Sequence, residues 1–218
     1  TDQWVENQLF DRPLYPIFLA GVYSVFGHNF DVLRIIQILM FVGIGVLIYF
    51  TCRFFISEKM SRFVSILWAL AYSPAAYAGI FYREIFFTLL IVVMLYFLYK
   101  AQHKSSLLYF SLSGLFLGLA LLTNSVLQFL IILLAINLFF VLKKKNTVFK
   151  IKSLLCFIIP FIIIVGSWAI FCQSNFKTVP AGGAGLFLAE RVETMHSIDD
   201  KYIEHLIGNG IGDYLALK

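Results

Sequence analysis

Long stretches without a charged residue divide the chain, and short basic loops separate several of them. About 20 apolar residues cross the hydrocarbon core of a bilayer as a helix, so each uncharged stretch predicts a transmembrane span. The stretches are residues 35–52, 63–81, 85–99, 105–142 and 153–176. The fourth is 38 residues long, and its polar centre at 122–125 predicts a turn between two spans. The pattern predicts an all-α, polytopic membrane bundle of about six transmembrane helices.

A further apolar stretch, residues 14–26, has only 13 residues and is followed by Gly27. It is too short for a span, so we expect an interfacial or re-entrant helix on the outer side of the membrane. With no internal repeat or low-complexity linker, we expect a single transmembrane domain over residues 1–218. Its outer parts would be a loop with the interfacial helix at 1–32 and a cap at 177–218.

Composition agrees with a membrane protein. The chain is 61% hydrophobic and 13% charged, whereas soluble domains are roughly 45–50% apolar and about 25% charged. A soluble enzyme, a nucleic-acid-binding module and a disordered tail are therefore excluded. The three cysteines show no metal-ligand spacing and are expected to be small buried hydrophobes.

The basic residues predict the orientation. Three loops of 25 residues in total, 53–62, 100–104 and 143–152, hold 10 of the 17 Lys and Arg residues. The positive-inside rule places these loops in the cytoplasm, which explains the net charge of +5 without a nucleic-acid partner. The turns near 82–84 and 123–125 and both termini then face outward. We expect a multi-pass protein of the plasma (inner) membrane with an extracytoplasmic active face.

Two charged segments lie on that outer face. Arg83-Glu84 stands between two apolar stretches, where ionisable groups are costly. Either the pair anchors a hairpin at the interface, or Glu84 binds a polar substrate while Arg83 contacts a phosphate. In Asp11-Arg12-Pro13-Leu14-Tyr15-Pro16 the prolines restrict the backbone. There Arg12 and Tyr15 are either interfacial anchors or contacts to a lipid phosphate.

Two features of the tail are less specific. The glycines of residues 182–185 permit either a flexible turn or close approach to a ligand. Glu193 and His196, three residues apart, supply only two ligands, so we predict no metal site.

The order of these motifs resembles the GT-C membrane glycosyltransferases that use polyprenyl-phosphate sugars, a group related to protein O-mannosyltransferases and the lipid A aminoarabinose transferase. Residues 12–27, RPLYPIFLAGVYSVFG, are similar to the family segment RPPxYPLFLAxxYxxFG. Ser73-Pro74 through Arg83-Glu84 resembles the family's hairpin, with Glu84 at its acidic position. Residues 114–124, GLFLGLALLTN, resemble GlllGLaaLtR, with Asn124 replacing the family's arginine.

The resemblance implies a glycosyltransferase that moves a sugar from a polyprenyl-phosphate donor to an extracytoplasmic acceptor on a glycan, lipid or protein. It implies a catalytic acid upstream of the Arg-Pro element, so we expect this chain to be a fragment whose catalytic Asp precedes Thr1. The residues expected to bind substrate are Arg12, Tyr15, Tyr82, Arg83, Glu84 and Asn124.

Other readings stay open at this point. The expected partners are the lipid-linked donor, membrane lipids and the acceptor, with no nucleic acid. A divalent metal cofactor is neither required nor excluded by the sequence. The same polar pair inside a membrane bundle would also fit a transporter or flippase for a lipid-linked or polar substrate. A non-catalytic assembly subunit is the third reading.

Overall fold

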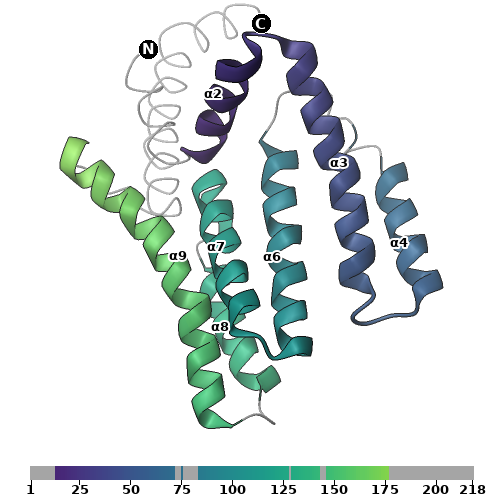
Figure 1. Cartoon of the computed structure of the whole chain (residues 1–218), viewed down its shortest axis with the longest axis vertical. Helices are drawn as coiled ribbons and strands as arrows, with labels where there is room; N and C mark the ends of the chain where they lie inside the picture. Colours follow the sequence, from purple (N-terminus) through teal and green to yellow (C-terminus); the bar gives the residue numbers. More distant parts are fainter. Residues whose placement is uncertain (1–12, 72–74, 76–82, 128, 143–145, 177–218) are drawn as a thin grey trace, which may run out of the picture. The chain divides into compact units, whose positions relative to one another are not determined.

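The computed structural model describes residues 13–71, 75, 83–127, 129–142 and 146–176. Within these ranges the secondary structure is helical and contains no strand, as predicted (Figure 1). The α-helices are α2 (Leu14–Phe26), α3 (Phe30–Cys52), α4 (Glu58–Leu70), α6 (Glu84–Lys104), α7 (Leu107–Thr123), α8 (Leu130–Val141) and α9 (Thr147–Phe176).

Three of these helices are long and apolar enough to cross a bilayer: α3, α6 and residues 147–174 of α9. Helices α2, α7 and α8 are apolar but shorter. The membrane character of the chain is therefore clear, while the count of six spans stays a prediction.

The predicted turn inside the 38-residue uncharged run is confirmed. Helix α7 ends at Thr123, and a 3-10 turn over Ser125–Leu127 leads to α8. Asn124 ends the helix with an extended backbone, and its Oδ1 accepts a hydrogen bond of 3.2 Å from the Val126 N–H. A side-chain amide thus supplies the polar partner that the interrupted helix lacks.

The helix predicted over residues 14–26 is also confirmed, with those bounds. It ends because Gly27 adopts φ +69°, a conformation that side chains disfavour. The following helix α3 starts at Phe30, five residues before the uncharged stretch, since Asn29 Oδ1 accepts hydrogen bonds from Asp31 and Val32 N–H groups. Its first turns carry an exposed Asp31–Arg34 ion pair of 3.3 Å.

Helix α7 forms the centre of one part of the bundle, packed against α6 and α9. Gly114 and Gly118 let the α7 and α9 backbones approach closely, as small residues four positions apart do in membrane helix pairs. Gly114 lies against Phe157, and Gly118 lies against Phe161 and Ile164. The order of these contacts shows that α7 and α9 run parallel.

A second cluster joins α3 to α4 and α6. The Trp68 Nε1 donates a hydrogen bond of 3.0 Å to the Phe41 carbonyl, and Ser65 Oγ donates one of 2.6 Å to the Gly45 carbonyl. Ile44 and Ile85 are buried beside them. Ile85 joins the first turn of α6, which begins at Glu84, to this cluster.

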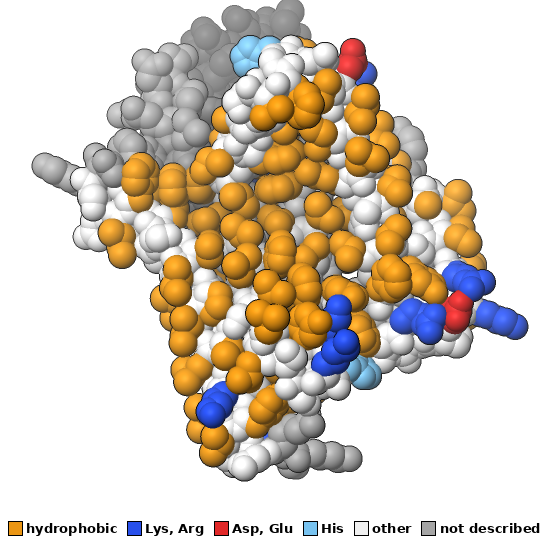
Figure 2. All heavy atoms as spheres, viewed as in Figure 1, with side chains coloured by type: hydrophobic (Ala, Val, Ile, Leu, Met, Phe, Trp, Pro, Cys, Tyr) orange, Lys and Arg blue, Asp and Glu red, His pale blue; other side chains and the backbone are white. Residues whose placement is uncertain are grey.

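The described residues of the basic loops lie at one end of this arrangement. Phe54 stacks on His103 with ring centroids 4.9 Å apart, so the loop after α3 adjoins the end of α6. Because α9 runs parallel to α7, Lys150 and Lys152 near its start lie level with the start of α7. Figure 2 shows most Lys and Arg side chains of one face in its lower half, beside a broad field of hydrophobic side chains. As predicted, the described basic residues of these loops lie at one end of the helices, whichever compartment that end faces.

The glycine contact gives a direct test of the packing. A Cβ at position 114 would fall well inside contact distance of the Phe157 carbonyl oxygen, which belongs to the backbone and cannot rotate away. We expect Gly114→Ala to lower the free energy of unfolding by about 1–3 kcal/mol. Unfolding of the purified protein in detergent, followed by circular dichroism, measures this. The matched control is Gly43→Ala on α3, where an added Cβ meets nothing within 4 Å. Equal stability of the two variants would contradict the close approach of α7 and α9.

Candidate functional site

A buried hydrogen bond joins the start of α2 to α3 at the end opposite the basic loops. Gln37 Nε2 donates to Tyr15 Oη at 3.0 Å, and the Gln37 side chain is completely buried. Helix α2 begins at Leu14 because Pro13 fixes the backbone, and the Pro13 carbonyl accepts the Ile17 N–H. This start aims Tyr15 toward α3.

Aromatic contacts join the start of α2 to α6. Phe18 and Phe86 stack with centroids 4.7 Å apart and planes at 16°, and the Tyr15 ring lies 6.2 Å from that of Phe86. Since Phe86 is in the first turn of α6, Tyr15 lies near Glu84, the first residue of that helix. Three elements distant in the sequence thus meet at one point.

Arg83 and Glu84 form a half-buried pair at the start of α6. The Arg83 Nε lies 3.8 Å from Glu84 Oε1, and the two side chains are 28% and 38% exposed. The helix N-terminus favours a negative charge at Glu84. The second carboxylate oxygen, Oε2, is buried and has no hydrogen-bond partner within the described part of the chain. A buried acceptor without a hydrogen bond is energetically costly.

The phenol of Tyr15 is held neutral. Burial of the ring raises the pKa of Tyr15 to about 12, and the nearby Tyr23 and Glu84 charges act in the same direction, while the Gln37 hydrogen bond opposes them. Tyr15 therefore keeps its proton across the physiological range and can act only as a neutral hydrogen-bonding group.

Asn124 follows the last residue of α7. Its side chain caps the turn after α7, as described above, and no described contact joins it to Tyr15 or Glu84. Helix α2 does pack against α7. The structure therefore brings Tyr15 and the Arg83–Glu84 pair together, whereas Asn124 stays a prediction. Arg12, Tyr82 and the tail residues Glu193 and His196 lie outside the described residues.

Gln37 was missed as a site residue by sequence reasoning. It was not among the residues predicted to bind substrate, although a buried carboxamide in a membrane helix needs a hydrogen-bonding partner. Its partner, 22 positions earlier, could not be read from spacing. Among the described residues no group of three or more His, Cys, Asp and Glu side chains could hold a metal ion.

The comparison with known families decides the identity. A family model described as dolichyl-phosphate-mannose-protein mannosyltransferase matches residues 11–170, and this range includes Tyr15, Gln37, Arg83 and Glu84. The chain belongs to this mannosyltransferase family. The family confirms the resemblance drawn from the motifs and indicates a mannosyltransferase-type membrane glycosyltransferase. No curated protein and no solved structure matches the chain.

The Tyr15–Gln37 contact is testable by a double-mutant cycle. Tyr15→Phe leaves the buried Gln37 amide without its phenolic acceptor and should cost about 1–3 kcal/mol of unfolding free energy. Gln37→Leu should then cost much less in the Tyr15→Phe background than in the wild type, when unfolding is measured in detergent. Tyr23→Phe is the control, because it removes a hydroxyl from the same helix while keeping the ring contact with His28. Strictly additive costs for Tyr15 and Gln37 would show that the hydrogen bond does not couple them.

Proposed function

We propose that this member of the mannosyltransferase family transfers a sugar from a polyprenyl-phosphate donor to an acceptor on the extracytoplasmic side of the plasma membrane. The observation that carries the proposal is the half-buried Glu84 carboxylate beside Tyr15 and Arg83, at the end opposite the basic loops. The acceptor is a hydroxyl or amine on a glycan, lipid or protein.

Each group has a chemical task in this proposal. Arg83, together with Arg12 of the adjoining segment, pairs with the donor phosphate, whose negative charge grows as the sugar leaves. The Glu84 carboxylate holds a sugar or acceptor hydroxyl through its buried Oε2. Tyr15 offers a neutral phenol for a further hydrogen bond, and Gln37 fixes the position of that phenol. Tyr82 and Asn124 complete the proposed substrate-binding set.

The position of the charges supports transfer at a membrane surface. Arg83 and Glu84 start α6 and therefore lie at one end of a helix long enough to span the bilayer. A transporter is the alternative, and the buried Gln37 inside α3 is the observation that favours it. Transporters place their substrate sites near the middle of the membrane. The clustering of Glu84, Arg83 and Tyr15 at one end therefore favours the enzyme.

The decisive assay follows sugar release from radiolabelled polyprenyl-phosphate mannose by the full-length protein in liposomes. Glu84→Gln keeps the shape of the side chain but removes its charge, so we expect turnover to fall about tenfold or more. Arg83→Gln should lower kcat and kcat/KM for the donor, because the lost phosphate contact is stronger in the transition state than in the ground state.

The matched control is the Asp31→Asn and Arg34→Gln pair of variants. Asp31 and Arg34 also form an acid–arginine pair at the same end of the bundle, but both are well exposed. Their loss should leave turnover unchanged. Unchanged turnover in Glu84→Gln would remove Glu84 from the site, and substrate flux across the vesicle without sugar release would favour a transporter.

A further inference from the structure

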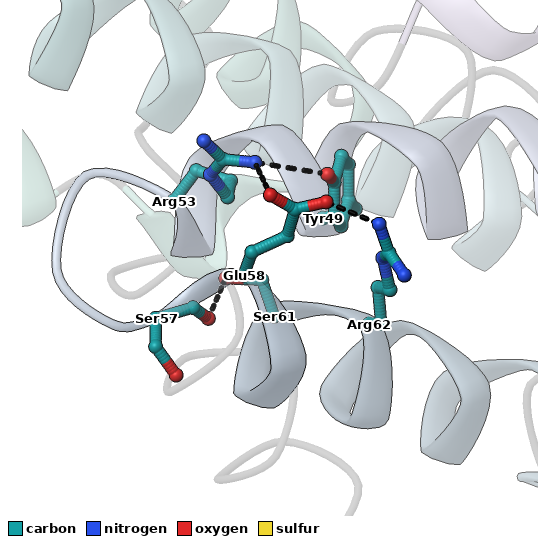
Figure 3. A network of polar contacts seen from close by, with 6 residues as sticks. All are labelled: Tyr49, Arg53, Ser57, Glu58, Ser61 and Arg62. Carbon is teal, nitrogen blue, oxygen red and sulfur yellow. Dashed lines mark hydrogen bonds and ion pairs between the residues drawn. The ribbon is translucent and has the colours of Figure 1, made fainter.

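The end of α3, the loop after it and the start of α4 form a helical hairpin over residues 49–63. This hairpin carries a network of charges (Figure 3). The Glu58 carboxylate pairs with Arg53 at 3.0 Å through Oε2 and with Arg62 through Oε1. The Arg53 Nη1 also donates to the Tyr49 hydroxyl at 3.1 Å. One carboxylate therefore fixes two guanidinium groups on opposite sides of itself.

Both guanidinium groups keep donors directed away from the carboxylate. Arg53 makes its contacts to Glu58 and Tyr49 through the same Nη1 atom, and Figure 3 shows its other terminal nitrogen pointing away. The second terminal nitrogen of Arg62 also points away from Glu58. The side chains of Arg53 and Arg62 are 45% and 65% exposed. With Lys59 the hairpin has three cations and one anion, so an excess of positive charge is presented at this surface.

The same hairpin exposes apolar side chains beside these charges. Phe55, Met60 and Phe63 are each more than half exposed. Phe55 is anchored edge-on against Tyr99 of α6, with ring centroids 4.4 Å apart. A free phosphate would use only the guanidinium groups, whereas a phospholipid offers an anion and acyl chains together.

The end of α6 contributes to this surface. The Phe54–His103 stack holds the hairpin against the last turn of α6, which also carries the exposed Lys104. Lys100 makes cation–π contacts instead: its Nζ lies 4.9 Å from the centroid of the Tyr96 ring and 4.8 Å from that of Tyr109. The cations near the hairpin are therefore Arg53, Lys59, Arg62 and Lys104.

We propose that this hairpin is a binding site for the headgroup of an anionic phospholipid. Arg53 and Arg62, held apart by Glu58, take the phosphate through their outward N–H groups, and Lys59 adds charge. The exposed Phe55 and Met60 lie against the acyl chains. The site is separate from the proposed transferase site and does not depend on the proposed function, so each proposal can fail alone.

The test compares the retention of spin-labelled phosphatidylglycerol and phosphatidylcholine by the full-length protein in liposomes, measured by electron paramagnetic resonance. We expect the wild type to prefer phosphatidylglycerol, and the Lys59→Gln/Arg62→Gln variant to lose at least about fivefold of that preference. The control Lys150→Gln/Lys152→Gln removes two charges from the same end of the bundle and should keep the preference. An equal loss in both variants would indicate a diffuse basic surface and overturn the site.

Two further measurements test whether the arginine geometry matters and whether the bound phosphate belongs to a lipid. Arg62→Lys keeps the charge but loses the planar, two-pronged donor group, so we expect part of the preference to disappear. An unchanged preference in Arg62→Lys would contradict a built site. Inorganic phosphate should fail to displace the labelled lipid when total ionic strength is held constant. Displacement by phosphate would assign the guanidinium groups to a free anion and overturn the lipid proposal.

Discussion

No water is available to a polar side chain buried in a bilayer, and this constraint sorts the polar groups of the chain. The buried Gln37 amide donates a hydrogen bond to the Tyr15 hydroxyl. That bond fixes α2 against α3, and the Phe18–Phe86 stack fixes α2 against α6. These two contacts place α2 beside the Glu84 carboxylate at the start of α6. The mannosyltransferase family match spans this whole arrangement.

The two ends of the bundle differ in how their charged side chains are placed. At one end, the Arg83–Glu84 pair is half-buried near aromatic rings, where electrostatic interactions are stronger than in water. At the other end, charges are numerous and exposed, and the Glu58 carboxylate organises two of them. The first arrangement suits recognition of a polar substrate, and the second suits the headgroups at a membrane surface. Between them lies close helix packing through Gly114 and Gly118.

Features that depend on local sequence could be predicted. The apolar run and Gly27 define α2, and the polar centre of the long run defines the turn at Asn124. The start of α3 at Phe30 was not foreseen, because its charged residues form an i,i+3 pair that keeps both solvated. The Tyr15–Gln37 bond and the Gly114–Phe157 contact join positions 22 and 43 apart, and no periodicity in a single sequence encodes such pairings. The proximity of Tyr15 and Glu84, and the support that Gln37 gives to Tyr15, could therefore be seen only in the structure.

Extracytoplasmic transfer requires the Tyr15–Glu84 end of the bundle to face the outer side of the membrane. The most direct measurement uses single cysteines in a background where Cys52, Cys156 and Cys172 are replaced, with a membrane-impermeant maleimide applied to intact cells. His28→Cys, in the turn between α2 and α3, should be labelled in intact cells. Ser57→Cys, in the basic hairpin, should be labelled only after permeabilisation. The reverse pattern would place the site in the cytoplasm and contradict extracytoplasmic transfer.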